Sequence, residues 1–187
     1  MKIFIMRHAR YIYSLGDYQK QKNGPMPSPE GLKETKAFAK QLARRKFAAI
    51  YANTANRSKI AARIIAEENA NHPRVLIDRR IDPMKVDYTG KDIISHVKNA
   101  KTRSRTGERW VGGELPSIEP LPDFMARVGG FLLSCAAANA GKGDILVVAH
   151  WETFAVADAM MHGTPLKKAM KAHDAFKYNK LYAFDVS

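Results

Sequence analysis

The sequence predicts an α/β sandwich built on a mostly parallel sheet, and two patterns carry this prediction. Short apolar runs alternate along the chain with segments of helical periodicity, as in successive strand–helix–strand units. Most of these runs are continuous rather than alternating, which is typical of strands covered on both faces. With 187 residues, of which 45% are apolar, the chain suits one domain with a substantial core.

The predicted elements follow one another in a regular order. Strands are expected at Lys2–Met6, Ala48–Tyr51, Arg74–Ile77, Asp144–Ala149 and Leu181–Val186. Helices are expected at Pro29–Arg45, Arg57–Asn69, Asp123–Ala138 and about Thr153–Met161. Ser28 is a suitable N-cap for the first helix, and Pro29 occupies the first helical position, where a missing N–H costs nothing.

Two stretches lack a regular pattern. Residues Ala9–Met26 indicate a long loop, and residues Ile81–Pro122 indicate an insertion rich in proline, glycine and charge. We therefore expect residues 1–187 to form a single domain with an irregular insertion around residues 81–122. Irregular segments of this length are often lids or binding loops.

The chain is strongly basic, since 31 Lys and Arg against 18 Asp and Glu give a net charge of +13. Such a charge attracts anions, whether nucleic acids, acidic lipids or phosphorylated metabolites. Basic residues gather in the insertion and near the C-terminus: Lys98, Lys101, Arg103, Arg105, Arg109, Lys167, Lys168, Lys171, Lys177 and Lys180. Few aromatic residues lie among them and no known module pattern occurs, which argues against nucleic acid. Two interpretations of these basic residues remain, a solvated face and a funnel for an anionic substrate.

The sequence predicts a cytoplasmic protein without membrane association. The apolar stretch Ile3–Met6 is too short for a signal peptide and is followed directly by Arg7. We expect no membrane span, because no window approaches the 18 or more apolar residues that a span needs. The single cysteine, Cys135, lies on an apolar helical stripe and is expected to be buried.

Charged and titratable side chains follow four of the predicted strands. Arg7 and His8 follow the first strand, Arg57 opens the helix after the second, Asp82 follows the third, and His150 follows the fourth. Ligands of open α/β sheets bind outside the carboxyl ends of the strands, so we expect these side chains to converge. Arg57 also stands at the unfavourable end of a helix dipole, where a cation gains from a bound anion.

Four short motifs occur at these strand ends and helix starts. Met6–Ala9 comes first, Ser28–Gly31 begins a helix, Ile50–Asn53 continues through Arg57 to Ala62, and Val147–His150 ends the fourth strand. In the same order, they resemble the Arg-His-Gly, Thr-x-x-Gly, Tyr-Ser-Ser…Arg-Ala…Thr-Ala and Val-Val-Ser-His elements of the phosphoglycerate mutase-like histidine phosphatases. The resemblance extends over essentially the whole chain.

This resemblance implies a three-layer sandwich with helices on both faces of the sheet, and a phosphatase without metal or cofactor. It assigns His8 as the nucleophile that becomes phosphohistidine, and Arg7, Arg57 and His150 as groups that bind the phosphoryl oxygens. A neutral imidazole can attack phosphorus, and guanidinium groups bind its equatorial oxygens well. The sequence shows no ligand set for a metal, since His162 and His173 lack partners at suitable spacing.

Several positions depart from the family pattern. Ala9 replaces a glycine, and Ser14 stands where many members have asparagine, though Ser14 could still donate a hydrogen bond to phosphate. The family's glutamate after the third strand, its proton donor, is missing. Nearby substitutes are Asp82, Asp87, Glu108 and Glu114, and a different branch places its acid just after the second histidine, where this chain has Glu152. We rank Glu152 first, Asp82 second and Asp87 third.

Three functions remain open from the sequence. The first is a phosphatase that acts on a small phosphorylated metabolite. The second is a phosphoprotein phosphatase, for example for phosphohistidine, whose leaving group needs little protonation. The third is a non-catalytic anion-binding member of the family. The sequence does not define the oligomeric state.

Overall fold

The computed structural model describes residues 1–12, 24–87, 89–91, 115–171 and 175–186. The strands of this part of the chain are β1 (Lys2–Arg7), β2 (Ala49–Ala52), β3 (Val75–Ile77), β4 (Ile145–Ala149) and β5 (Tyr182–Asp185). The α-helices are α2 (Pro29–Gln41), α3 (Asn56–Glu68), α6 (Leu121–Asn139), α7 (Trp151–His162) and α8 (Leu166–Lys171). A short 3₁₀ helix, η1 (Arg79–Ile81), follows β3.

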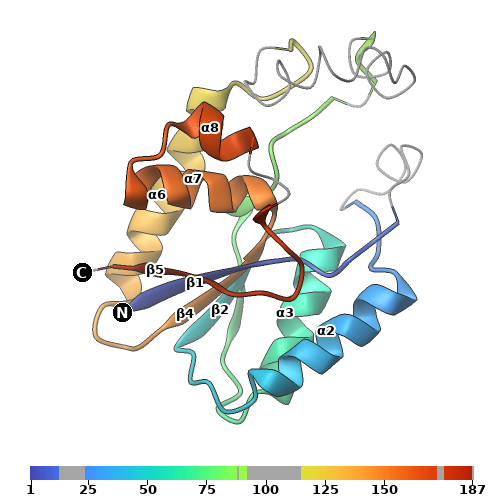
Figure 1. The fold of residues 1–187 in the computed structure, drawn as a ribbon, viewed down its shortest axis with the longest axis vertical. Helices are drawn as coiled ribbons and strands as arrows, with labels where there is room; N and C mark the ends of the chain where they lie inside the picture. The colour runs from blue at the N-terminus through green and yellow to red at the C-terminus, as the bar shows by residue number, and fades with distance from the viewer. Residues whose placement is uncertain (13–23, 88, 92–114, 172–174, 187) are drawn as a thin grey trace.

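The strands form one mixed sheet in the order β3-β2-β4-β1-β5 (Figure 1). The pairs β2–β3, β2–β4 and β1–β4 are parallel, and of the described strands only β5 runs antiparallel, at the edge beside β1. Each strand lies within one or two residues of its predicted position. The prediction of a mostly parallel sheet is confirmed.

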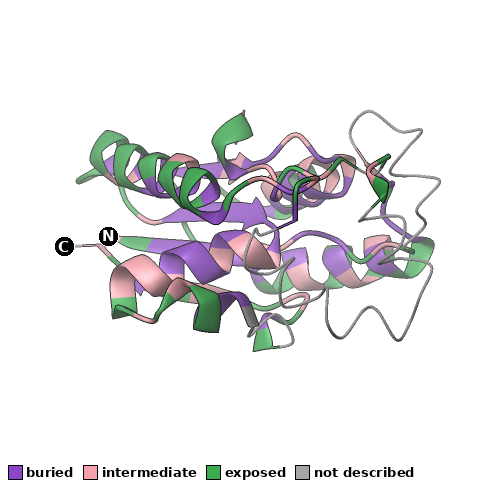
Figure 2. Ribbon diagram, turned by 90° about the horizontal axis from the view of Figure 1, so that it is seen from above, coloured by how far each residue is buried: buried purple, intermediate pink, exposed green. Residues whose placement is uncertain are grey.

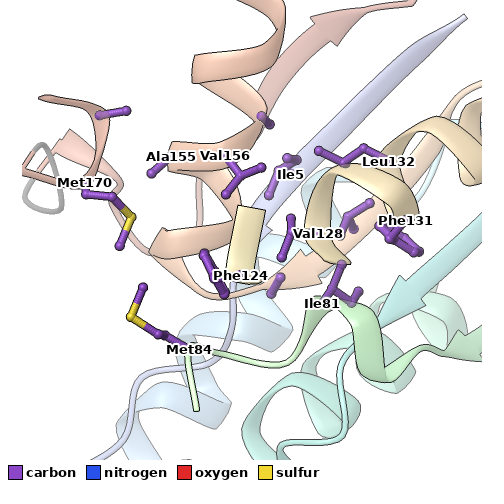
Figure 3. Close-up of a cluster of buried hydrophobic side chains, with 14 of the residues drawn as sticks. Ile5, Ile81, Met84, Phe124, Val128, Phe131, Leu132, Ala155, Val156 and Met170 are labelled. Carbon is purple, nitrogen blue, oxygen red and sulfur yellow. The ribbon is translucent and has the colours of Figure 1, made fainter. Parts of the chain in front are cut away.

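Helices cover both faces of the sheet, so the predicted three-layer sandwich is also confirmed (Figures 1 and 2). Successive side chains of β1 and β4 point to opposite faces, as the pleat requires. Phe4, Met6, Leu146 and Val148 pack under α2 and α3. The alternate residues Ile3, Ile5, Ile145 and Val147 pack under α6 and α7 in the larger cluster shown in Figure 3. The apolar runs of β1 and β4 are continuous because both faces of these strands are buried.

The helix that opens with Pro29 ends earlier than its periodicity predicts, at Gln41 rather than Arg45. A tertiary contact accounts for the difference. The buried amide of Asn69 donates to the carbonyls of Leu42 and Arg45, which holds the chain in a turn after the helix. The helix α8 was not predicted, because its six residues are too few to show a period.

Helix α6 corrects one expectation, because its length and mean hydropathy of 1.2 would allow it to cross a membrane. In the fold, however, its apolar residues Phe124, Val128, Phe131 and Leu132 are buried in the core over the sheet (Figure 3). Its hydropathy is therefore explained by core packing.

Arg127 of α6 secures the beginning and end of the predicted insertion, of which residues 92–114 lie outside the described residues. Its guanidinium donates to the carbonyls of Arg80, Asp82 and Pro83 and to both carboxylate oxygens of Glu119. Val86 and Ile118 form an antiparallel bridge next to this network. The segment after β3 is thus held against α6, which determines where Asp82 lies.

Candidate active site

The carboxyl ends of the parallel strands bring the predicted side chains to one edge of the sheet. Arg7 is the last residue of β1 and lies in register with Ala149, the last residue of β4. His8 continues this pairing, because its backbone N–H donates to the carbonyl of Ala149 at 2.9 Å. His150 therefore follows directly beside His8, with their ring centroids 4.4 Å apart.

His8 is buried and held in a defined tautomer. Its Nδ1 lies 2.8 Å from the carbonyl oxygen of Ala9, which can only accept, so Nδ1 carries the proton. The lone pair is then on Nε2, which accepts from Nε of Arg57 at 3.3 Å. Burial, followed by the charges of Arg57 and Arg7, lowers the pKa of His8 well below its ordinary value, although the bond to Ala9 opposes this. His8 is thus a neutral imidazole with its lone pair turned to the cations.

Arg57 lies in the first turn of α3, and only 1% of its surface is exposed. Its guanidinium contacts Nε2 of both His8 and His150, and it stacks 4.6 Å above the ring centroid of Tyr11. The first turn of this helix holds no acidic residue. A buried cation with these neighbours at a helix N-terminus fits a site that binds an anion.

His150 is the residue directly before α7 and is buried. Its Nδ1 lies 2.8 Å from the side-chain amide of Asn53, the residue that follows β2. Burial, followed by the charges of Arg57, His8 and Arg7, lowers the pKa of His150 well below its ordinary value. Like His8, it is neutral at physiological pH.

Arg7 borders the same site from the end of β1. It donates to the carbonyl of Phe176 at 3.2 Å and lies 4.2 Å from the ring centroid of Tyr178. Its Nε is buried and makes no hydrogen bond within the described residues. This donor is available to a bound anion.

Sequence reasoning missed two aromatic residues at this site. The rings of Tyr11 and Tyr178 lie 5.4 and 5.8 Å from that of His8, and their faces hold the guanidinium groups of Arg57 and Arg7. Tyr178 pairs with Arg7 in an isolated bridge across the sheet edge. Its place just before the last strand, within the basic stretch for which a solvated face and an anion funnel both remain open, is the available signal.

Glu152 and Asp82, ranked first and second as proton donors, differ in their surroundings. Glu152 lies in the first turn of α7 next to His150, with its Oε2 buried and without a hydrogen bond partner within the described residues. Burial raises the pKa of Glu152 to about 7, against the opposing effects of its own backbone N–H and the charges of Arg57, Arg7 and Arg127. A carboxyl group with this pKa holds its proton near neutrality, as a general acid requires.

Asp82 instead accepts hydrogen bonds from Thr54. Its Oδ1 accepts from the backbone N–H and the hydroxyl of Thr54, at 2.8 and 2.9 Å. Asp87 likewise accepts from the backbone N–H and the hydroxyl of Thr89, and both bonds are exposed. The other candidates, Ser14, Glu108 and Glu114, lie outside the described residues. The described residues contain no group of three or more His, Cys, Asp or Glu that could hold a metal ion.

The fold and the site together define an α/β protein with neutral histidines and arginines at the carboxyl ends of its strands. The chain belongs to the histidine phosphatase superfamily (branch 1), whose sequence profile matches residues 3–182. No curated protein sequence matched significantly.

Solved structures support the same fold. YhfR of Bacillus stearothermophilus superposes with a TM-score of 0.77 at 18% identity, over 100% of this chain and 91% of that one. The α-ribazole phosphatase of Shigella flexneri gives 0.74 at 17% identity, with the same coverage. A mycobacterial glucosyl-3-phosphoglycerate phosphatase gives 0.70 at 19% identity, over 91% of this chain and 83% of that one. At these identities the likeness shows the fold alone.

Proposed function

We propose that this protein is a phosphatase that hydrolyses a phosphate monoester through a phosphohistidine on His8. The observation that carries the proposal is the neutral, Nδ1-protonated imidazole of His8, whose Nε2 lone pair lies among Arg57, His150 and Arg7. The phosphatases among the structural neighbours favour hydrolysis. We place the activity in the cytoplasm, on an anionic phosphorylated substrate.

The reaction has two steps. In the first, Nε2 of His8 attacks phosphorus, the P–O ester bond breaks, and the leaving oxygen takes the proton of Glu152. In the second, the Glu152 carboxylate removes a proton from water, whose oxygen attacks phosphorus while the P–N bond breaks and returns its electron pair to His8. Arg7, Arg57 and His150 bind the phosphoryl oxygens, on which negative charge is spread.

The raised pKa of Glu152, which has one buried carboxylate oxygen, favours an alkyl phosphate over phosphohistidine hydrolysis or simple anion binding. A poor leaving group requires protonation, and Glu152 carries a proton near neutral pH. Phosphohistidine as substrate would place little demand on this group, and a purely anion-binding protein would place none. Hydrolysis of an alkyl phosphate therefore explains the raised pKa of Glu152, which the two other functions leave unexplained.

Trapping of the phosphoenzyme tests this proposal. Rapid quenching of the purified protein with an aryl phosphate should yield a phosphoenzyme that is acid-labile and alkali-stable, and His8→Ala should abolish it. His162→Ala, at the exposed end of α7, is the matched control and should retain the phosphoenzyme. Full activity in His8→Ala would contradict the proposal, and wild-type protein that binds phosphate without turnover would favour the anion-binding function.

A further inference from the structure

Asn53 lies directly after β2, is fully buried, and links the segments that follow β2, β3 and β4. Its Oδ1 accepts from the backbone N–H of Ala55 at 3.0 Å. Its Nδ2 donates to the carbonyl of Ile81, the last residue of η1, at 3.2 Å. The same Nδ2 lies 2.8 Å from Nδ1 of His150, just after β4.

The two backbone contacts determine which way the amide of Asn53 faces. Turning it over would place the amide NH₂ against the N–H of Ala55 and the amide oxygen against the carbonyl of Ile81, which would lose both hydrogen bonds. Leaving buried polar groups without partners is costly, because they have already given up their water. Asn53 therefore presents a donor to Nδ1 of His150, and that nitrogen must accept.

We propose that Asn53 is a positioning residue that holds neutral His150 in its Nε2–H tautomer, so that His150 donates a hydrogen bond to a phosphoryl oxygen. A neutral imidazole with its lone pair on Nδ1 carries its proton on Nε2. His8 has the opposite tautomer, because the carbonyl of Ala9 takes its Nδ1–H. One histidine is thus prepared to attack phosphorus and its neighbour to donate to the oxygens. The role in catalysis rests on the proposed function, whereas the tautomer does not.

Arg57 favours the opposite tautomer of His150. Its Nη2 contacts Nε2 of His150, and a guanidinium can only donate, so this contact alone would require the lone pair on Nε2. The amide of Asn53 is held by two backbone groups and cannot rotate without losing them. The guanidinium of Arg57 lies at the end of a long side chain and also donates to His8. Asn53 therefore decides the tautomer, and Arg57 and His150 become two adjacent donors suited to one anionic oxygen.

Nitrogen NMR on the ¹⁵N-histidine-labelled full-length protein tests the tautomer without relying on activity. The His150 signals are assigned by their absence in His150→Gln. We expect a neutral ring with an unprotonated Nδ1 and a protonated Nε2, both before and after addition of inorganic phosphate. A protonated Nδ1 with an unprotonated Nε2 would overturn the proposal, as would a ring that exchanges equally between both forms.

Asn53→Asp tests the consequence for the reaction. A carboxylate at this position accepts from Nδ1–H, so Nε2 of His150 carries a proton only when the ring is cationic. The charged and titratable groups that lower the His150 pKa are Arg57 from α3 and His8 and Arg7 from the end of β1, and none of them is changed. Hydrolysis of an aryl phosphate should therefore fall as pH rises through the His150 pKa. At the high-pH limit the loss should be about 10²-fold, as for removal of one donor to the transition state.

Asn139→Asp is the matched control. Asn139, the last residue of α6, is also buried, and its amide donates to the carbonyl of Cys135 and to the hydroxyl of Tyr51 rather than to a histidine. We expect its pH profile to match that of the wild type. A uniform loss of activity in Asn53→Asp, without the new pH dependence, would overturn the proposal. If the wild type has no phosphatase activity, the proposed function fails and the NMR result still decides the tautomer.

Discussion

In the proposed mechanism, Glu152 donates the proton that the leaving group takes. It stands at the start of α7, where any carboxylate suits the helix dipole, so its position alone does not mark it as functional. One of its carboxylate oxygens is buried without a partner among the described residues, and burial disfavours the charged form and raises the pKa of Glu152 to about 7. Such an arrangement is costly for stability and useful for proton transfer.

Replacement of Glu152 by glutamine should separate two classes of substrate. Alkyl phosphates need a proton on the leaving oxygen and nitrophenyl phosphates scarcely do. Glu152→Gln should therefore slow alkyl phosphates by about 10²–10⁴-fold and aryl phosphates far less. In the wild type, alkyl phosphate hydrolysis should decline above about pH 7, where Glu152 loses its proton. Steady-state rates on both substrates measure this, with Asp82→Asn as the comparison. Equal losses on both substrates in Glu152→Gln would rule it out as the acid.

The same substitution should change how stability depends on pH. The pKa of Glu152 is raised from 4.5 to about 7 in the folded state, so the folded protein binds this proton more tightly than the unfolded chain. The free energy of unfolding therefore falls as pH rises from 4.5 to about 7 and then stays low. Glu152→Gln removes this effect and should gain at most about 3 kcal/mol over the wild type above pH 7, and nothing at pH 4.5. Urea unfolding at several pH values measures the difference.

Among the elements, α2 begins close to the segment that follows β1 and carries His8. Ser28 caps the helix by accepting from the N–H of Gly31 at 3.0 Å, as the sequence predicts. Only the fold shows why position 31 is a glycine. A Cβ on Gly31 would lie 2.2 Å from the carbonyl oxygen of Arg10, two residues after His8.

Gly31→Ala should therefore push α2 away from the segment that carries His8. We expect a loss of about 1–3 kcal/mol in stability, as for other overpacked sites, together with a lower kcat. Gly130→Ala is the control, since Gly130 lies on the exposed side of α6 and a Cβ there would meet nothing within 4 Å. Gly130→Ala should gain up to about 1 kcal/mol in stability from helix propensity and leave activity unchanged. Thermal unfolding and phosphatase assays of the two variants test this, and equal stability of both would contradict it.

At the scale of the whole molecule, the net charge of +13 attracts anions in general. Selectivity for one anion requires cations that are held together out of water. Arg7 and Arg57 at the carboxyl ends of the strands are partly and fully removed from water, so salt screens their attraction for an anion less than it screens that of exposed lysines. The rest of the charge attracts anions without selecting among them.

Tungstate or vanadate should compete with substrate and raise the melting temperature. At a concentration about 100 times Kd, the anion should stabilise the fold by about 2.7 kcal/mol. Arg57→Gln should abolish this stabilisation, whereas Arg63→Gln, which removes one exposed charge from the same helix, should retain it. Chelators should leave activity intact. Thermal shift and inhibition assays measure these effects, and a strict requirement for a divalent metal would count against the site.

The sequence by itself determined the strands, most of the helices and the convergence of His8, Arg57 and His150. These follow from local periodicity and from the rule that parallel strands end at one edge of a sheet. Only the tertiary structure decided which carboxylate has a buried oxygen, where Tyr178 lies and which groups the ring nitrogens of His8 and His150 contact. The reason is distance along the chain: the contact of Asn53 with His150 joins residues 97 positions apart, and that of His8 with Arg57 joins residues 49 apart. No local pattern records such a contact, because it depends on how the whole sheet packs.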